Sequence, residues 1–251
     1  MSRRVALITG AQAGIGAACA RRLAKDGIAV GVLDLRAEHC EKTQAEIALA
    51  GGKCLSVGAD ISNREQVKAA VARVRADLGP ITILVNNAAV TGYTPFLEIT
   101  DAQWEAVHKV NLTGTFIVTQ EVLPDMVSAN WGRIINISSS AAQTGAKNMA
   151  HYASSKGAMI ALTRTLAVEF GPNNITANVI PPRFITGTIM SDHSFANSEQ
   201  PMSKEALAAA GPIRREGRPE DIAGAVAWLA SEESGYVTGQ MIGVNGGRII
   251  S

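Results

Sequence analysis

The chain has 251 residues, 47% of them hydrophobic, and its 23 basic and 22 acidic residues leave a formal net charge of +1. A charge this close to zero favours neither nucleic acid nor an anionic membrane as a partner, and the length suits one large core, so we expect a single domain over residues 1–251 that acts on a small molecule. The spacing of Cys19, Cys40 and Cys54 suits no metal site and leaves one thiol unpaired in any disulfide scheme, which is typical of a reducing cytoplasm.

The first residues, MSRRVALITGAQAGIGAACA, have the two arginines and the apolar stretch of a twin-arginine or secretory signal. We reject that interpretation because the apolar segment breaks at Gly10 and Gln12, and because cleavage after it would remove a glycine loop. No apolar run approaches the roughly 18 residues that suggest a membrane span. We therefore expect a cytoplasmic protein without membrane contact.

Short runs of β-branched residues alternate with longer helix-like segments along the whole chain, as in a parallel sheet covered on both faces. The runs are almost continuously apolar, as expected of strands that are buried on both sides. A closed (β/α)8 barrel also fits this alternation, but the glycine loop after the first strand favours an open sheet. We predict one Rossmann-type, doubly wound α/β domain whose seven parallel strands are residues 5–9, 28–34, 53–59, 81–86, 132–138, 175–180 and 240–245.

The first strand runs through Gly10, Gly14 and Gly16 into a helix. Glycines there let the backbone approach a pyrophosphate closely, and the helix amino terminus offers free N–H groups. Three residues separate the first two glycines, which departs from the usual dinucleotide fingerprint, so an ordinary tight turn is the alternative.

Asp34 ends the second predicted strand, about 20 residues beyond the glycine loop, where an acid accepts hydrogen bonds from the adenosine ribose. A carboxylate there repels a 2′-phosphate, so we expect NAD to be preferred over NADP. Arg36 argues the other way, whereas Ala11 and Gln12 bring no positive charge to the loop. The alternative for Asp34 is a plain cap at the end of the strand.

Helix starts are marked by capping residues. Ser62 with Glu65 and Thr100 with Gln103 fit the capping box, and Pro219 suits a first helical turn. We therefore predict helices that begin at these three places.

Tyr152 and Lys156 lie four residues apart in the stretch HYASSK, so they share one face of a predicted helix. A phenol titrates near pH ~10, and an ammonium about 4 Å away at an effective dielectric of about 20 stabilises the phenolate by roughly 4 kcal/mol, about 3 pH units. We expect Lys156 to lower the pKa of Tyr152 toward neutrality. The alternative is a structural pair on a solvated helix, but Ser138 to Ser140 end a buried strand just before this helix, at the edge where open α/β sheets bind ligands.

Periodicity is lost over residues 181–212, which contain Met190, Phe195 and Met202 among polar residues. A loop of this length in a compact domain is usually functional. We expect a lid over the substrate, within the single domain.

These motifs together resemble the short-chain dehydrogenase/reductase family over nearly the whole chain. The matching stretches are TGAQAGIG, NNAA, VNLTGTF around Asn111, Ser139 thirteen residues before Tyr152, YASSK, and YVTGQMIGVNGG. The resemblance implies hydride transfer between a nicotinamide ring and a carbonyl or alcohol carbon. It also implies a homotetramer.

By position, the resemblance makes Tyr152 the general acid/base and Ser139 a hydrogen-bond partner of the reacting oxygen. Lys156 would lower the tyrosine pKa and hold the nicotinamide ribose, and Asn111 would support a water leading to Lys156. The residues expected to bind the cofactor are Gly10, Gly14, Ile15, Gly16, Asp34, Asp60, Ile61, Asn87, Tyr152, Lys156, Pro182 and Ile185. No metal ligand is expected.

Three positions depart from the family pattern. Ala89 stands where a glycine is usual, Arg183 follows Pro182 where glycine is usual, and Gly187 replaces a threonine. If the backbone at Arg183 requires a positive φ, a side chain there costs on the order of 1 kcal/mol. Our hypothesis is that Arg183 lies beside the pocket and steers an acidic substrate or narrows the cleft; the alternative is an outward arginine without a role.

The sequence thus predicts an oxidoreductase that transfers hydride between NAD(H) and a secondary alcohol or ketone. One alternative is an NADPH-dependent 3-oxoacyl-carrier-protein reductase. A nucleotide-sensing protein without turnover is the alternative of another class.

Overall fold

The computed structural model describes residues 4–188, 191, 206, 209 and 211–250. Its centre is a parallel sheet of six strands in the order β3-β2-β1-β4-β5-β6. The order reverses between β1 and β4, which confirms the predicted doubly wound α/β class. The strands are β1 (Val5–Thr9), β2 (Ala29–Asp34), β3 (Cys54–Gly58), β4 (Ile83–Asn86), β5 (Gly132–Ile137) and β6 (Ile175–Ile180).

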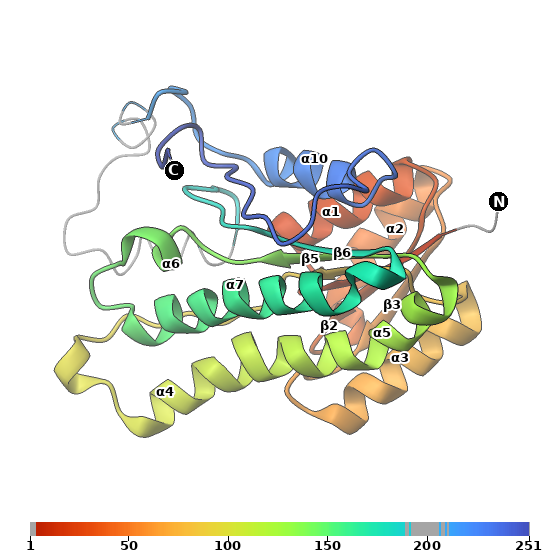
Figure 1. The fold of residues 1–251 in the computed structure, drawn as a ribbon, viewed down its shortest axis with the longest axis horizontal. Helices are drawn as coiled ribbons and strands as arrows, with labels where there is room; N and C mark the ends of the chain where they lie inside the picture. The colour runs from red at the N-terminus through yellow and green to blue at the C-terminus, as the bar shows by residue number, and fades with distance from the viewer. Residues whose placement is uncertain (1–3, 189–190, 192–205, 207–208, 210, 251) are drawn as a thin grey trace.

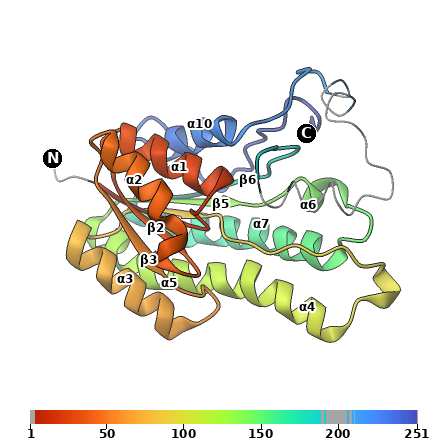
Figure 2. The ribbon, with the colours of Figure 1, turned by 180° about the vertical axis from the view of Figure 1, so that it is seen from behind.

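Helices cover both faces of the sheet (Figure 1), and the reverse view shows the same two layers (Figure 2). One face carries α1 (Gly14–Lys25), α2 (Glu41–Leu49) and α10 (Pro219–Leu229), and the other carries α3 (Arg64–Leu78), α5 (Thr115–Ala129) and α7 (Ala150–Phe170). None of the helices in the described ranges has the length and hydropathy that a membrane crossing requires. Shorter helical pieces in the connections are η1 (Ala37–Cys40), η2 (Phe96–Glu98), α4 (Asp101–His108), α6 (Ala141–Thr144) and η4 (Gly171–Asn173).

Alternate residues of each strand face opposite helix layers, and both layers are apolar. Ala6 and Ile8 of β1 belong to the core that α1 and α10 share, whereas Val5 and Leu7 belong to the core with α3 and α5. Successive strand side chains point to opposite faces of a sheet. Burial on both sides is therefore the reason why the strands are almost continuously apolar.

A π-helical turn, η3 (Lys109–Gly114), joins α4 to α5, so the three run on as one long helix (Figure 1). Single π turns inside α-helices interrupt the regular ladder and recur at functional sites. Asn111 lies in this turn.

The last of the seven predicted strands is not a regular strand of the sheet. A single parallel bridge joins Val179 of β6 to Met241. The side chain of Asn178 takes up backbone groups of the same segment: Nδ2 donates to the carbonyl oxygen of Val237 (2.7 Å), and Oδ1 accepts from the amide nitrogen of Gln240 (3.1 Å). Backbone bonds also join the segment to β6: Gly239 donates to the carbonyl of Ala177 (2.7 Å), Val179 donates to that of Gln240 (2.9 Å), and Ile242 donates to that of Val179 (2.8 Å). The segment thus follows β6 over a few residues without forming a longer strand.

At the opposite edge of the sheet, a glutamine side chain covers part of β3. Gln44 of α2 reaches over β3, and its Oε1 accepts a hydrogen bond of 2.7 Å from the backbone nitrogen of Ser56. A side chain thus occupies a donor that an edge strand would otherwise offer to another chain.

Most of the predicted lid over residues 181–212 lies outside the described residues, as do Met190, Phe195 and Met202. Its first part is tied down, because Ile185 forms a parallel bridge with Gly217 and the backbone nitrogen of Thr186 donates to the Gly217 carbonyl (3.0 Å).

Two of the three predicted helix starts are confirmed. Thr100 and Gln103 form the expected capping box at α4, and Pro219 is the first residue of α10. The cap predicted at Ser62 is wrong. The N-cap of α3 is Asn63, one residue further on.

The side chain of Asn63 wins this position because its Oδ1 accepts from the backbone nitrogens of Glu65 (3.1 Å) and Gln66 (3.2 Å). The hydroxyl of Ser62 instead donates to Oδ1 of Asp60 (2.8 Å). Asparagine is among the best capping residues, so the shift by one residue follows from the side chain that reaches two N–H groups.

We expect Asn63→Ala to lower the free energy of unfolding by about 1 kcal/mol, because two N–H groups of the first turn of α3 lose their acceptor. Ser62→Ala is the matched control and should cost less, since its hydroxyl bonds to no N–H group of the helix. Urea unfolding followed by circular dichroism measures both. A larger loss for Ser62→Ala than for Asn63→Ala would contradict the assignment of the cap.

Candidate functional site

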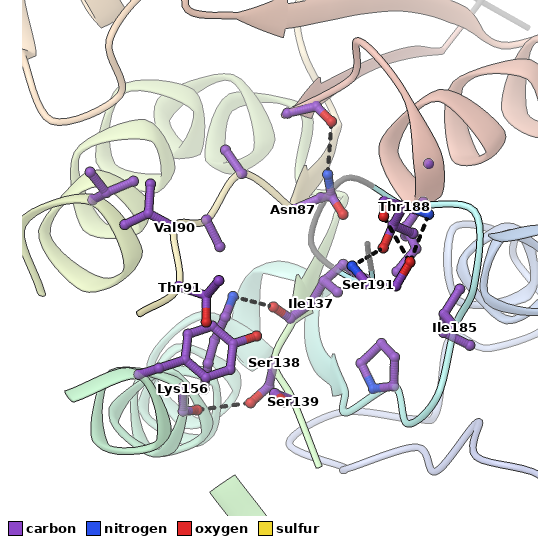
Figure 3. A pocket seen from close by; sticks show the side chains of 18 of the residues that line it. Asn87, Val90, Thr91, Ile137, Ser138, Ser139, Lys156, Ile185, Thr188 and Ser191 are labelled. Atoms are coloured by element: carbon purple, nitrogen blue, oxygen red, sulfur yellow. Dashed lines mark hydrogen bonds between the residues drawn. The ribbon is translucent and has the colours of Figure 1, made fainter. Parts of the chain in front are cut away.

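A cleft of about 1210 Å³ lies at the carboxyl edge of the sheet (Figure 3). Residues from the ends of all six strands line it. Gly16 and Asn111 are the predicted site residues that do not line the cleft. Those that do are Gly10, Gly14, Ile15, Asp34, Asp60, Ile61, Asn87, Ser139, Tyr152, Lys156, Pro182 and Ile185.

The loop between β1 and α1 needs its glycines. Gly10 and Gly14 have φ values of +65° and +57°, in the left-handed region, and a Cβ on Gly16 would lie 2.3 Å from the carbonyl oxygen of Gly10. Asn87, just after β4, holds the loop from the other side, because its Nδ2 donates to the carbonyl oxygens of Thr9 and Gly10 (3.0 Å each; one of the two bonds is drawn in Figure 3). The backbone at this point is therefore both tight and fixed.

The amino terminus of α1 faces the same cleft with its N–H groups available. Ala13, its N-cap, provides no capping side chain, and the first turn carries no acidic residue. Such a helix end attracts an anion through its N–H groups and its dipole. A glycine loop of this shape fits the pyrophosphate of a dinucleotide.

Asp34 lies at the end of β2 and is 9% exposed. Its Oδ1 accepts from the backbone nitrogen of Leu35 (2.9 Å), its Oδ2 accepts from that of Gln12 in the glycine loop (3.3 Å), and Nδ1 of His39 lies 3.6 Å from Oδ1. Arg36 is exposed. The carboxylate is thus held at the cleft, where it can accept hydrogen bonds from ribose hydroxyls.

Asp60 and Ile61 follow β3 and shape the neighbouring wall of the cleft. Oδ1 of Asp60 accepts from the backbone nitrogen (2.9 Å) and the hydroxyl (2.8 Å) of Ser62. Ile61 lies so close to the π turn that a Cβ on Gly114 would meet its Cγ1 at 2.7 Å. Together with the glycine loop and Asp34, these residues fit the adenosine half of a dinucleotide.

Tyr152 and Lys156 share one face of α7 and both line the cleft, as predicted. The phenol is 5% exposed and hydrogen-bonds with Ser139, which follows β5. Burial raises the pKa of Tyr152 to about 12; the Ser139 bond lowers the pKa by less, and the nearby Tyr93 raises it further. The phenol therefore keeps its proton at neutral pH.

Lys156 is 1% exposed, and its Nζ donates to the carbonyl oxygen of Ile137 (2.8 Å; Figure 3). Burial lowers the pKa of Lys156 to about 7. Its Nζ lies 6.0 Å from the centroid of the Tyr152 ring. The predicted lowering of the Tyr152 pKa is therefore wrong for this chain by itself, because desolvation dominates both groups and disfavours both charges.

Asn111 lies behind the cleft and is fully buried. Its Oδ1 accepts from the backbone nitrogen of Val90 (2.8 Å), and its Nδ2 donates to the Val90 carbonyl (2.9 Å) and to Oγ of Ser155 (3.0 Å). The π turn thus ties the segment after β4 to helix α7. This arrangement keeps the two walls of the cleft in register.

The three departures from the family pattern all lie at the cleft or just beyond it. Ala89 and Arg183 line the cleft, and Gly187 has a φ of +70°, which suits glycine and would strain a threonine. The positive φ considered for Arg183 belongs instead to Phe184, at +63°. The sequence placed the turn correctly but assigned the strained position one residue too early.

Several lining residues were not predicted, among them Tyr93, Thr188 and Ser191. Thr188 and Ser191 hydrogen-bond to each other at 2.7–3.2 Å (Figure 3), and a Cβ on Gly14 would meet Cγ2 of Thr188 at 3.1 Å. Segment 91–93 could have been found from its position after β4, since chain beyond a strand's carboxyl end borders the ligand site of an open sheet. Nothing in the sequence marks Thr188 and Ser191.

Comparison with known proteins identifies the family. The family model described as Enoyl-(Acyl carrier protein) reductase matches residues 10–248. Nodulation protein G of Azospirillum brasilense is 41% identical over 248 residues, which cover 98% of both chains. A 3-oxoacyl-[acyl-carrier-protein] reductase of Aquifex aeolicus is 38% identical over 97% of this chain and 96% of its own, and an acetoacetyl-CoA reductase of Cupriavidus necator is 35% identical over 98% of both. The chain is a member of the short-chain dehydrogenase/reductase family of oxidoreductases.

Proposed function

We propose that the protein transfers a hydride between NAD(H) and a secondary alcohol or its ketone. The observation that carries this proposal is the hydrogen-bonded pair of Ser139 and Tyr152 beside a buried Lys156, at the sheet edge that also carries the glycine loop. A nicotinamide bound along that loop would supply or accept the hydride. The residues described above would then transfer a proton to or from the substrate oxygen and stabilise the negative charge that develops on it.

The protonation state of Tyr152 supports ketone reduction as the direction favoured at neutral pH. With a pKa of about 12 the phenol is protonated, so it can donate to an oxygen that becomes an alkoxide. Ser139 adds a second hydroxyl donor to the same oxygen. Oxidation of the alcohol needs the phenolate and should therefore be favoured by alkaline conditions.

Lys156 is suited to moving protons, because a pKa of about 7 lets its amine gain and lose a proton near neutrality. We propose that it resupplies the proton that Tyr152 gives up. Asn111 would support a water on the way to Lys156.

The position of Asp34 supports NAD over NADP, because its carboxylate would repel a 2′-phosphate and its neighbour Arg36 is exposed. The second candidate is an NADPH-dependent 3-oxoacyl-carrier-protein reductase, favoured by the names of the Aquifex aeolicus and Cupriavidus necator relatives. A nucleotide-binding protein without turnover is the third. A clear preference for NADPH, or nucleotide binding without turnover of any carbonyl compound, would favour these alternatives.

We also propose a homotetramer in the cytoplasm. Large apolar side chains that are exposed on the η2–α4 segment support an assembly, since such a patch marks an interaction surface. They are Phe96 (71% exposed), Leu97 (96%) and Trp104 (40%).

Tyr152→Phe removes the proton donor and should lower kcat/KM by about 10²- to 10⁴-fold. The measurement is the absorbance of reduced nicotinamide, with NAD(H) and NADP(H), against a panel of ketones and secondary alcohols. Tyr236→Phe is the control, because Tyr236 is fully exposed and should leave the rate unchanged. Unaltered turnover in Tyr152→Phe would rule out the assigned role.

Asp34→Ala should shift the ratio of kcat/KM for NAD over NADP by roughly ten- to a hundredfold toward NADP, because a charge repulsion of about 1.4–2.8 kcal/mol is removed. Asp77→Ala is the matched control. It removes an acid that pairs with Arg73 on the surface of α3 (2.6 Å) and lies outside the cleft. If wild type already prefers NADP, the NAD assignment fails.

Lys156→Met should remove a pH dependence of stability. Between about pH 7, the folded pKa, and the ordinary value of 10.5, the unfolded chain binds a proton at Lys156 that the folded chain does not. The free energy of unfolding of wild type should therefore rise with pH through this window.

The variant lacks that contribution. The unfolding free energy of wild type minus that of the variant should therefore increase from about pH 7 to about pH 9. Taking this difference cancels the buried cysteines, whose raised pKa values act equally in both proteins. Urea unfolding at several pH values gives the measurement. A constant difference would show that Lys156 is charged in the folded chain.

A further inference from the structure

Arg183 lies at the end of the cleft where Ser139 is found. The backbone nitrogen of Ser140 donates to the carbonyl of Pro182 (3.1 Å), which fixes the residue before Arg183 against the turn that carries Ser139. On the other side, the carbonyl oxygen of Phe184 accepts a hydrogen bond from the backbone nitrogen of Gly217 (3.2 Å). The arginine therefore projects from a stretch of chain that is held at both ends.

Its guanidinium points toward α6, on the Ser139 side of the cleft. Nη1 donates to the hydroxyl oxygen of Thr144 (3.3 Å). The hydroxyl proton of Thr144 is directed at the carbonyls of Ser140 (3.2 Å) and Gly145 (3.1 Å), so its oxygen is left to accept from Arg183. One N–H of the guanidinium is thus used to aim it, and an arginine carries five.

Within the described ranges, no carboxylate pairs with this cation. Among the residues that the structure describes, Arg183 takes part in no ion pair, although it is half-buried. The carboxylates among the described lining residues are Asp34 and Asp60, after β2 and β3. Arg183 follows β6, four strands away from β2 in the sheet, which is about 19 Å at the usual strand spacing of about 4.8 Å. That separation exceeds the screening length of about 8–10 Å at moderate salt.

The wall on the other side of Arg183 contains two further arginines and one acid. A smaller hollow of about 380 Å³ shares Arg183 and Ile185 with the cleft, and its wall includes Arg215, Arg248 and Asp221. Arg215 is paired with Asp221 through two bonds of 2.6 and 2.7 Å, and Arg248 lies over the ring of Phe184, 5.0 Å from its centroid. The acid in this wall is thus paired with Arg215, and the nearby carboxylate of Glu216 accepts a hydrogen bond from the hydroxyl of Thr186 (2.7 Å). Neither of these two described acids forms an ion pair with Arg183.

We infer that the substrate of the reaction carries an anionic group, a carboxylate in its simplest form, which pairs with the guanidinium of Arg183 while the carbonyl lies between Ser139 and Tyr152. This inference rests on the proposed function and adds to it the chemical class of the substrate. A planar guanidinium binds a carboxylate through two parallel N–H bonds, so the pair fixes the orientation of the substrate as well as its affinity.

The test compares oxo carboxylates with their neutral methyl esters, because each pair shares one carbon skeleton and differs in charge. Suitable pairs are 4-oxopentanoate, 5-oxohexanoate and 6-oxoheptanoate with their esters, which vary the distance between carbonyl and carboxylate. The readout is the ratio of kcat/KM for acid over ester, measured with saturating NADH. Taking the ratio cancels losses that come from misfolding or poor cofactor binding.

For the best chain length, wild type should prefer the acid by roughly 10- to 100-fold, the range expected for hydrogen bonds to a charged group. Arg183→Gln should lower the ratio by roughly tenfold or more, and Arg183→Lys should keep part of it, since the charge remains and the two-pronged geometry is lost. Arg73→Gln removes an equal charge from the surface of α3 and should leave the ratio unchanged. A ratio near one for every pair in wild type, or an unchanged ratio in Arg183→Gln, overturns the inference.

A binding measurement separates this inference from the proposed function. Hexanoate should raise the melting temperature of wild type in the presence of NAD, hexanamide should not, and Arg183→Gln should lose the response to hexanoate. That result without turnover of any ketone would support the anion site and contradict the proposed function. Turnover of acids and esters at equal rates would support the function and contradict the anion site. An equal response to hexanoate in wild type and Arg183→Gln would also contradict the anion site.

Discussion

All six strands of the sheet run in the same direction, and the site depends on this constraint. Parallel strands place their carboxyl ends at one edge, so six separate stretches of sequence meet there. Asp34 ends β2, and the glycine loop, Asn87, Ser139 and Arg183 each follow a different strand. Because the order reverses between β1 and β4, their connections leave in opposite directions and the edge opens into a cleft. The chemistry is thus assembled by topology rather than by proximity in the chain.

Burial then decides the charge of the groups that the topology brings together. The amine of Lys156 donates to a backbone carbonyl, and the Tyr152 phenol hydrogen-bonds with the hydroxyl of Ser139. Neither partner compensates for the loss of water, so the neutral forms of both groups are favoured. A neutral phenol is the form that can donate a proton to a ketone oxygen. The resting state of the protein is thereby prepared for one direction of the reaction.

Much of the fold could be predicted from the sequence, because alternation of apolar strands and capped helices is a local signal. Six of the seven strands were placed within a few residues, and the glycines of the first loop are required by the positions that Gly10, Gly14 and Gly16 occupy. The seventh pairs with β6 only between Gly239 and Ile242, and the extent of such pairing is a tertiary property that periodicity does not encode. The cap at Asn63 was missed because two capping residues stand side by side, and only geometry decides between them.

The site was predictable in its residues and less so in its electrostatics. Tyr152 and Lys156 share a helix face, which follows from their spacing alone. The direction of their pKa shifts does not follow from spacing, because it depends on how much water the surrounding elements remove. The same limit applies to Arg183: its departure from the family pattern is visible in the sequence, whereas its bond to Thr144 and its lack of a described acidic partner belong to the tertiary structure.

The two edges of the sheet are covered in different ways. Along β6, the segment from Gly239 to Ile242 bonds to the backbone of Ala177 and Val179, whereas at β3 the side chain of Gln44 accepts from the amide nitrogen of Ser56. Growth of the sheet from one molecule into the next is discouraged at both ends. Edge-to-edge association of copies into fibres is therefore disfavoured.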